Sequence, residues 1–317
     1  MSIQIIGTGA YVPDKIITND DLSQMVETSD EWITQRVGVR ERRISVNETT
    51  ADMAVRAAKQ ALENAGVTAS QLGLIVVATA TGDMIVPSTA ALVQGSIGAV
   101  CPAFDISSAC SGFLFALDTA AAFLARGGID YALVIGAERL SRALNWKDRS
   151  TCVIFGDGAG AAVIKPGDNY LCSMLHTLGN ADVLSIPAGK SNSPFYTRSE
   201  PDYQINMKGQ ETFKFAVRRI VDDLRSIAAK AGIAIEKLKY IVPHQANVRI
   251  IDLAARRLKL PIEKFVLNIE RYGNTSSASV PISLHELAVS GKLQRGDLIA
   301  MCAFGGGLSS AACIIRW

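Results

Sequence analysis

The segment AFDISSACSGFLFALDTAAAFLA, residues 103–125, decides the fold, because it changes from a strand pattern to a helix pattern within a few residues. The hydrophobic run from Pro102 to Ile106 predicts a buried strand, and the Ala, Leu and Phe pattern from Gly112 onward predicts a helix. Cys110 lies between them among small residues that let a substrate approach closely. The free N–H groups and the dipole at a helix start favour a thiolate. Cys110 is therefore a candidate nucleophile, although a buried cysteine without a chemical role fits the same pattern.

Two polar residues in the second half of the chain have the chemistry that such a nucleophile needs. His244, in KYIVPHQANVRI, follows a predicted strand at 240–242 and precedes a helix that begins near Asn247. Asn274, in RYGNTSSASVPISLHEL, lies in a turn before another predicted helix. An imidazole can act as a base or a donor, and an amide can donate to a developing oxyanion. These two residues are candidate partners of Cys110.

The chain has three histidines, and only one is placed where active sites of α/β proteins form. His285 lies within a predicted helix, and His176 follows a predicted strand at 171–175. His244 is at a strand end, which favours a functional role. A structural role for this single histidine is the alternative.

The composition is ordinary for a globular enzyme. The chain has 317 residues, of which 49% are hydrophobic and 20% are charged, so its length predicts two domains or one large duplicated unit. The net charge of +2 gives no reason to expect nucleic acid as a partner. The N-terminal sequence MSIQIIGTGAYVP lacks the pattern of a signal peptide, and no apolar run reaches membrane-spanning length. We therefore expect no association with a membrane.

The cysteines predict a reduced protein of the cytoplasm. Most of the six lie in apolar, strand-like runs, and no two form a C-x-x-C motif. This pattern favours free thiols over a disulfide framework or a zinc site. We expect a cytoplasmic location and no metal.

An internal duplication organises the chain. The segment 65–81 resembles the segment 231–247 at an offset of 166 residues, and the same offset aligns DYALVIGA with GDLIAMCA. It also places Cys110 against Ser276. Chance similarity is the alternative, but a constant offset over separated segments favours two related halves. Each half reads as strands alternating with helices, which predicts sheets covered by helices on both faces. We predict an N-terminal half at 1–168 and a C-terminal half at 169–317.

The motifs SSACSGF, VPHQAN, GNTSSASVP and AFGGG, in this order and spacing, resemble those of β-ketoacyl-[acyl-carrier-protein] synthase III in the thiolase superfamily. The resemblance covers essentially the whole chain and implies an α/β fold of the thiolase-like, duplicated αβαβα five-layer type. It implies the decarboxylative Claisen condensation that initiates type II fatty-acid synthesis. In that reaction an acyl-CoA primer and malonyl-ACP give 3-oxoacyl-ACP, CoA and carbon dioxide through an acyl-Cys110 intermediate. His244 and Asn274 would complete the catalytic set, and acyl-CoA would be a substrate, with no cofactor required.

The resemblance also assigns binding residues. Backbone N–H groups of Cys110 and Gly306 would hold the oxyanion of acyl transfer. Trp32 and Arg149 would stack on the two faces of the adenine of CoA, a geometry that suits an indole ring and a guanidinium plane. The full set implied for CoA is Thr28, Trp32, Arg36, Arg149, Gly209 and Asn247.

Three further expectations concern partners and the primer. Exposed basic residues on predicted helices would dock an acidic acyl carrier protein, although such charges are usually only a solvated helix face; they are Lys214, Arg249, Arg256 and Arg257. The loop at 80–94 would reach over the site of a second subunit in a homodimer, where Val86 would shape the end of the acyl pocket. Because Val86 is small, we expect primers longer than acetyl to be accepted. Ser277 stands where many relatives have a small apolar residue, and we expect no functional consequence.

Two alternatives stay open. One is a homologue in specialised metabolism that condenses or only transfers acyl groups, because it would need the same Cys110 and His244. The other is a non-catalytic subunit that binds a carrier protein, against which the intact set of Cys110, His244 and Asn274 argues.

Overall fold

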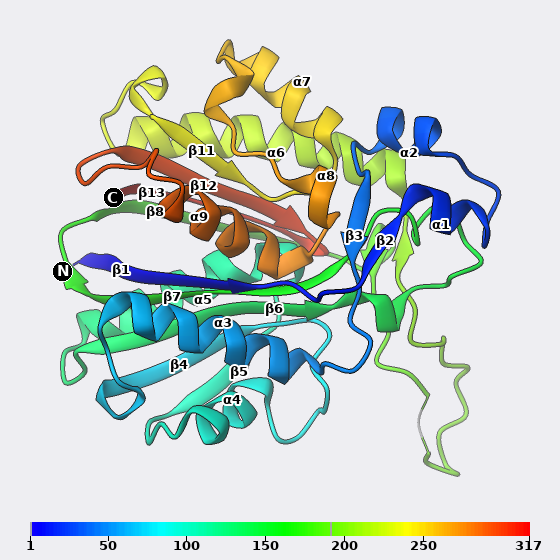
Figure 1. Ribbon diagram of the computed structural model, residues 1–317, viewed down its shortest axis with the longest axis horizontal. Coiled ribbons are helices and arrows are strands. Elements are labelled where there is room, and N and C mark those ends of the chain that lie inside the picture. The colour runs from blue at the N-terminus through cyan, green and yellow to red at the C-terminus, as the bar shows by residue number, and fades with distance from the viewer. Residues whose placement is uncertain (1, 191) are drawn as a thin grey trace.

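The computed structural model describes residues 2–190 and 192–317, and it contains two principal sheets that lie face to face (Figure 1). The first has the strand order β1-β7-β6-β4-β5, and the second has the order β11-β12-β13-β8. In the first sheet β4, β5 and β6 are parallel, whereas β7 is antiparallel to both of its neighbours. The strands are β1 (Ser2–Tyr11), β4 (Leu72–Ala78), β5 (Ala103–Ile106), β6 (Tyr131–Arg139), β7 (Asp157–Gly167), β8 (Tyr170–Asn180), β11 (Tyr240–Pro243), β12 (Leu298–Gly305) and β13 (Gly307–Arg316).

Helices cover both faces of each sheet and complete five layers. Helices α5 and α9 lie between the two sheets, α3 and α4 cover the outer face of the first sheet, and α6 with α7 covers the outer face of the second (Figure 1). The predicted thiolase-like, five-layer α/β fold is confirmed. The helices are α3 (Thr50–Ala65), α4 (Thr89–Ile97), α5 (Gly112–Ala125), α6 (Gly209–Lys230), α7 (Val248–Leu258) and α9 (Ser279–Val289).

The composition of each helix follows from its layer. Helix α5 is apolar around most of its circumference because it packs on strands of both sheets. Helix α3 is amphipathic and presents alanines to β1, where the strand has Gly7 and Gly9. A Cβ atom at Gly7 would lie 2.4 Å from the carbonyl oxygen of Ala61, and one at Gly9 would lie 2.2 Å from that of Ala57. These glycines are therefore what allows the helix to approach the strand closely.

Smaller elements surround one end of the sheets. They include β2 (Ile16–Thr18), α1 (Asn19–Ser23), α2 (Asp30–Arg36), β3 (Glu41–Arg43), β9 (Leu184–Ser185), β10 (Asn206–Met207) and α8 (Ile269–Tyr272). Helices α1 and α2 lie at the same side of the molecule as the start of α6 (Figure 1).

The two central helices begin in the same way, which corrects one detail of the predicted alignment of the halves. A short turn precedes each helix, and each turn begins with a residue in the left-handed region, Ala109 at φ 45° and Ser276 at φ 48°. The offset between these residues is 276 − 109 = 167. Cys110 therefore corresponds to Ser277, not to Ser276, because one extra residue enters the second half before this turn. The predicted division at residue 168 falls in the turn between β7 and β8.

Two local predictions were wrong. His176 lies within β8, where it pairs with Ser310 of β13, because the strand continues to Asn180. Strand β5 is half-buried, not buried, because it is the edge of its sheet and pairs only with β4. Its outer edge is open in the single chain.

Candidate active site

Cys110 lies in the tight turn between β5 and α5, as predicted. The turn Ala109–Ser111 is a single 3₁₀ turn that leads directly into the helix at Gly112. The Cys110 side chain is 7% exposed and borders two cavities. Gly305, at the end of β12, passes so close that a Cβ atom there would lie 2.7 Å from the backbone nitrogen of Cys110. The second half of the chain thus supports the nucleophile turn of the first half.

His244 follows β11 and is almost completely buried, at 1% exposure. Its backbone N–H donates to the carbonyl oxygen of Cys302 at 2.8 Å, which continues the pairing with β12. The Nδ1 atom lies 2.6 Å from the Ser279 hydroxyl, and the Phe304 ring packs edge-on at 5.2 Å between ring centroids. Burial lowers the pKa of His244 to about 3, so its imidazole is neutral at physiological pH.

Asn274 lies in a turn that is fixed by backbone contacts to the first half. Its N–H donates to the carbonyl oxygen of Ile154 at 2.9 Å, and its own carbonyl accepts from the N–H of Gly156 at 3.0 Å. The side-chain Oδ1 accepts from the N–H of Ser276 at 2.8 Å. Because Oδ1 is occupied in this way, the amide nitrogen is the end of the side chain that is available as a donor.

The structure brings the three predicted catalytic residues to one place. A cavity of about 180 Å³ is lined by Cys110, His244 and Asn274 together. A larger cavity of about 730 Å³ lies on the other side of Cys110, with Gly306 and the apolar side chains of Phe115 and Leu184 in its wall. Cys110 is therefore at the junction of a narrow cavity, which contains the polar side chains of His244 and Asn274, and a wider one.

The helix start was predicted to favour the thiolate form of Cys110, but the pKa of this group is raised in the folded protein. Burial raises the pKa of the Cys110 thiol to about 12, and the negative charge of Glu138 raises the pKa further. The hydroxyl of Ser276 acts in the opposite direction and lowers this pKa. Removal of water outweighs the local donors, so the resting group is the thiol.

The residues predicted to bind CoA include one stacked pair, Trp32 and Arg149. The guanidinium of Arg149 stacks on the Trp32 ring at 5.4 Å from its centroid and donates to the carbonyl oxygen of Glu27 at 2.7 Å. Two stacked contacts of about 3.5 Å each need a wider gap, so Arg149 must move before an adenine can lie between them. The Thr28 hydroxyl is buried and has no hydrogen-bond partner among the described residues.

Two of the remaining residues predicted to bind CoA line the same small cavity as Cys110, whereas Arg36 does not. Gly209 and Asn247 line the small cavity. Asn247 caps α7 by accepting from the N–H of Arg249, and its amide donates to the carbonyl oxygen of Arg36 at 2.9 Å. Asn247 therefore also ties α7 to α2, on which Arg36 is exposed.

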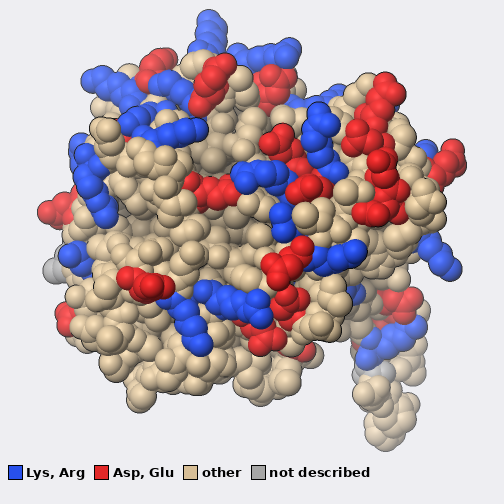
Figure 2. Space-filling view, in the orientation of Figure 1, with Lys and Arg blue, Asp and Glu red and all other residues tan. Residues whose placement is uncertain are grey.

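The basic residues predicted to dock a carrier protein lie on the two neighbouring helices α6 and α7. Lys214 is exposed on α6, and the guanidinium of Arg249 on α7 lies 5.8 Å from the centroid of the Phe213 ring, which lines the small cavity. Arg256 pairs with Asp252 at 2.9 Å, and Arg257 is exposed beside it. Figure 2 shows basic side chains gathered over these helices, with acidic ones between them.

Val86 does not line the cavities of its own chain, so its predicted contact with the acyl pocket of a second subunit stays a prediction. The described residues that line the two cavities around Cys110 do not include it, and its side chain is 82% exposed. Its neighbours Met84 and Ile85 are exposed as well, at 56% and 91%. An exposed run of apolar side chains is unfavourable in water and is typical of an interaction surface.

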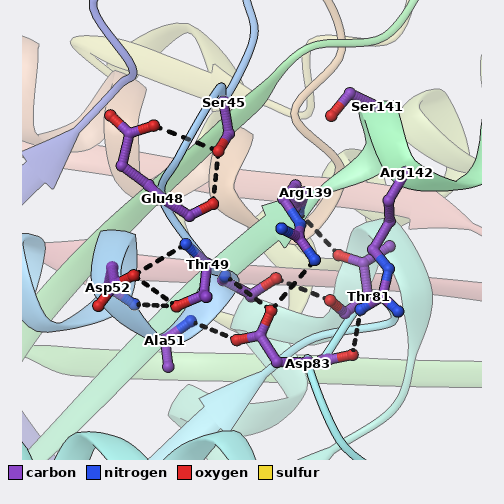
Figure 3. A network of polar contacts seen from close by, with 12 residues as sticks. Ser45, Glu48, Thr49, Ala51, Asp52, Thr81, Asp83, Arg139, Ser141 and Arg142 are labelled. Carbon is purple, nitrogen blue, oxygen red and sulfur yellow. Dashed lines mark hydrogen bonds and ion pairs between the residues drawn. The ribbon is translucent and has the colours of Figure 1, made fainter.

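The base of this loop is held firmly, as Figure 3 shows. The Asp83 carboxylate accepts from the N–H groups of Thr50 and Ala51 at the start of α3, at 3.0 and 2.9 Å. The guanidinium of Arg142 donates to the carbonyl oxygen of Gly82 at 2.8 Å, and Arg139 lies 3.5 Å from Asp83. The apolar tip therefore projects from a fixed base.

Sequence reasoning missed Glu138, the last buried residue of β6. It is 0% exposed and touches both the loop after β4 and the turn that carries Asn274. A charged residue directly after the apolar run YALVIGA was the available signal.

Two further findings concern metals and membranes. Within residues 2–190 and 192–317, the acidic, histidine and cysteine side chains form no group that could hold a metal ion. Among the helices of the same residues, none combines the length and the apolar character that crossing a membrane requires.

Comparisons with known proteins agree with the geometry. Two family models match, 3-oxoacyl-[acyl-carrier-protein] synthase III over residues 104–182 and its C-terminal part over residues 228–317. The β-ketoacyl-[acyl-carrier-protein] synthase III of Clostridium beijerinckii is 49% identical over 100% of this chain and 99% of its own length. The crystal structure of the corresponding enzyme of Aquifex aeolicus is 46% identical, with a TM-score of 0.92 over 99% of this chain and 100% of that one.

A third similar structure is that of a priming β-ketosynthase from the R1128 polyketide pathway. It is 34% identical, with a TM-score of 0.92 over 99% of this chain and 96% of its own. The matches cover both halves and include Cys110, His244 and Asn274 within the matched ranges of the family models. The chain therefore belongs to the β-ketoacyl-[acyl-carrier-protein] synthase III family and is a condensing acyltransferase with the thiolase-like fold.

Proposed function

We propose that this enzyme joins an acyl group from acyl-CoA to the two-carbon unit of malonyl-ACP, with Cys110 as the nucleophile, and so initiates fatty-acid synthesis. The observation that carries the proposal is the cavity lined jointly by Cys110, His244 and Asn274. The Cys110 sulfur attacks the thioester carbonyl of acyl-CoA, and CoA leaves as its thiol with the proton that Cys110 loses. The product of this first half-reaction is acyl-Cys110.

In the second half-reaction, malonyl-ACP replaces CoA and loses carbon dioxide. The electron pair of the broken carbon–carbon bond passes to the thioester as an enolate, whose carbon attacks the acyl-Cys110 carbonyl. The carbon–sulfur bond to Cys110 then breaks, 3-oxoacyl-ACP leaves, and the Cys110 thiolate takes up a proton from solvent to restore the thiol. These two half-reactions need no cofactor, because the two thioesters and the malonyl carboxylate are the only reacting groups.

His244 and Asn274 are suited to stabilise the enolate oxygen. When the Ser279 hydroxyl donates to Nδ1 of the neutral His244 ring, the ring carries its proton on Nε2, which is then a donor. The Asn274 amide is the second donor, because its Oδ1 is held by Ser276. Two donors in a site that excludes water stabilise a developing negative charge strongly.

The oxyanion of acyl transfer requires a different pair of donors. We assign it to the backbone N–H groups of Cys110 and Gly306, which border the same large cavity. The end of β12 at Gly305 packs directly on the Cys110 turn, and Gly306 follows it. This arrangement supports a position for the thioester carbonyl oxygen between the N–H groups of Cys110 and Gly306.

CoA would reach Cys110 along the residues of α2 and the small cavity. The Trp32 ring and the Arg149 guanidinium would hold the adenine once Arg149 has moved, and Arg36 is exposed on the same helix. The unpartnered hydroxyl of Thr28 provides a polar contact for the ligand. Gly209 and Asn247 would line the path of the pantetheine arm.

Malonyl-ACP would approach by the same opening, guided by the basic side chains of α6 and α7. Lys214 and Arg249 are nearest to it, because Gly209 and Asn247, which line the cavity, lie at the start of the same helices. Arg256 and Arg257, at the far end of α7, would extend this surface. Long-range attraction of an acidic carrier protein would raise the association rate more than the final affinity.

We further propose a homodimer in which the tip at Met84, Ile85 and Val86 covers the large cavity of the partner. The open edge of β5 and the exposed apolar tip lie in the same half of the chain, and Val100, three residues before β5, is 89% exposed. Burial of this apolar surface would stabilise the pair. The large cavity supports primers longer than acetyl. The free cysteines support a location in the cytoplasm.

A role in specialised metabolism is the second candidate, and the similarity to the R1128 priming ketosynthase favours keeping it. Both functions use the same acyl-Cys110 chemistry, so the primer and the carrier protein distinguish them. A non-catalytic role is disfavoured because Cys110, His244 and Asn274 line one cavity.

The deciding experiment is intact-protein mass spectrometry after mixing with acetyl-CoA and, separately, octanoyl-CoA. We expect an adduct on the wild type that is absent from Cys110→Ser and that malonyl-ACP discharges as 3-oxoacyl-ACP. The preferred chain length names the primer. Absence of an adduct with every acyl-CoA would contradict the assignment of Cys110.

A further inference from the structure

Glu138 is a buried carboxyl group at the end of β6, with no ion-pair partner among the described residues. Burial raises its pKa, and hydrogen bonds to the carboxylate oppose that shift. Taking a carboxyl group out of water without a cation is costly. A group of this kind is retained only where the contacts that it makes compensate for that cost.

The contacts of Glu138 come from both halves of the chain. From the first half, the N–H of Ala80 donates to both carboxylate oxygens, at 3.2 and 3.1 Å, and the Thr81 hydroxyl donates at 2.5 Å. From the second half, the hydroxyls of Ser276 and Ser277 lie 3.2 and 2.8 Å from Oε1. Glu138 thus joins the loop after β4 to the turn before α9.

That turn has a conformation that needs support. Ser276 is a non-glycine residue at φ 48°, a backbone region that side chains other than glycine rarely adopt. Its strain is of the kind that persists only where the surroundings fix it. The turn is seated directly on β6, because a Cβ atom at Gly136 would lie 2.3 Å from the carbonyl oxygen of Ser277. Glu138, two residues farther along the same strand, holds the two serine side chains.

The same turn fixes the catalytic amide. The N–H that orients the Asn274 side chain belongs to Ser276, and the bond is 2.8 Å long. If Ser276 relaxed to an ordinary conformation, its N–H would turn away from Oδ1 of Asn274. The amide could then rotate, and the donor proposed for the enolate would be displaced.

We propose that Glu138 is a positioning residue that holds the Ser276–Ser277 turn through its two hydroxyls and thereby aims the Asn274 amide at the enolate of the second half-reaction. The inference rests on the role proposed above for Asn274. Ser277, which is expected to be without consequence on sequence grounds, is one of the two contacts through which Glu138 acts.

The test compares the two half-reactions in Glu138→Gln and Ser277→Ala, which removes the 2.8 Å contact to Glu138. The amide introduced by Glu138→Gln has only one acceptor oxygen, whereas the donors come both from the loop after β4 and from the Ser276–Ser277 turn. We expect acylation of Cys110 by acyl-CoA to change by less than about threefold in this variant. Discharge of acyl-Cys110 by malonyl-ACP should fall about 10- to 100-fold, because loss of a whole oxyanion donor costs about 10²- to 10³-fold. Ser277→Ala should slow discharge similarly, and the double variant should discharge no more slowly than the slower single one.

Asp157→Asn is the matched control for burial. Asp157 is also 0% exposed and accepts from the N–H of Ser45 and from the N–H and hydroxyl of Ser141. Asp157→Asn should lower the melting temperature by at least as much as Glu138→Gln while leaving the ratio of the two half-reaction rates unchanged.

Three results would overturn the inference: unchanged discharge in Glu138→Gln, equal losses in both half-reactions, or multiplicative losses in the double variant. Asn274→Ala separates this failure from failure of the proposed function. If that variant discharges acyl-Cys110 as fast as the wild type, the role of Asn274 itself is wrong. Ser277→Ala keeps the test valid if Glu138→Gln does not fold.

Discussion

The Nδ1 atom of His244 lies 2.6 Å from the hydroxyl of Ser279, the first residue of α9. The two residues are far apart in the sequence, and the contact fixes the ring that follows β11 against the helix that follows the Asn274 turn. The neutral ring can donate from only one nitrogen, so what occupies Nδ1 decides whether Nε2 carries the proton.

Replacing Ser279 should therefore impair the second half-reaction. We expect Ser279→Ala to slow the discharge of acyl-Cys110 by about tenfold, because the ring can then adopt the other tautomer. Acylation by acyl-CoA should stay close to the wild-type rate. Single-turnover measurements of both steps check this, with Ser290→Ala, an exposed position just after α9, as the control. Equal slowing of both steps would contradict a role through His244.

The pKa of His244, lowered to about 3 by burial, predicts how stability depends on pH. Between its ordinary value near 6.5 and about 3, the unfolded chain binds a proton at this residue and the native protein does not. This group therefore makes the protein less stable as the pH falls through that range, by about 1.4 kcal/mol per pH unit at most.

Urea unfolding of the wild type and of His244→Asn at about pH 7.5, 6.5 and 5.5, a series that spans the ordinary pKa of histidine, checks this expectation. Subtracting the two curves removes the contributions of the buried carboxyl groups and of His285, which titrate in both proteins. The stability of the wild type relative to the variant should fall as the pH is lowered. A difference that is independent of pH would show that His244 is accessible to protons in the native state.

Gly305 should not tolerate a side chain. A Cβ atom there would lie 2.7 Å from the nitrogen and 3.0 Å from the Cβ atom of Cys110, so Gly305→Ala must displace the nucleophile turn. We expect the rate of acyl-Cys110 formation to fall by about 100-fold, because small misplacement of reacting groups is costly. Gly95→Ala, within α4, has open space around it and should leave the rate unchanged. Normal acylation in Gly305→Ala would show that the turn can shift without loss.

Removing the guanidinium that stacks on Trp32 should weaken CoA binding and spare the chemistry. We expect Arg149→Ala to raise KM for acyl-CoA about tenfold with little change in kcat, because adenine would lose one stacking surface worth about 1–2 kcal/mol. Lys147→Ala, exposed in the same segment, should not change KM. Steady-state kinetics with acyl-CoA, and with a short thioester that lacks adenine, separate the two effects. An equal loss with both substrates would contradict an adenine contact.

The exposed tip at residues 84–86 should be needed for dimer formation and for activity. Ile85 is 91% exposed, and a charge there would oppose burial against a partner. We expect Ile85→Asp to shift the protein from dimer to monomer in analytical ultracentrifugation and to lower condensing activity at least tenfold. Val289→Asp, at a 63% exposed position at the end of α9, should do neither. A monomeric wild type would contradict the proposed assembly.

Much of the architecture and the positions of the three catalytic candidates could be predicted from local sequence patterns. The change from an apolar strand to a helix at Cys110, and the strand end at His244, depend on periodicity and on residues near in the chain. The motifs were specific enough to indicate the family. The apolar composition of α5 likewise reflects its burial between two sheets.

The tertiary structure alone decided how these residues work together. The contact of Ser279 with His244, the approach of Gly305 to Cys110 and the clamp of Glu138 on Ser276 each join segments that are distant in the chain. The ionisation state of the Cys110 thiol also depends on the tertiary structure. The local helix start favours the thiolate, but burial by both halves of the chain raises the pKa of the thiol to about 12. Periodicity in the sequence indicates which face of a helix or strand is buried. Desolvation and hydrogen bonding depend instead on which groups cover that face, and only the folded chain determines those groups.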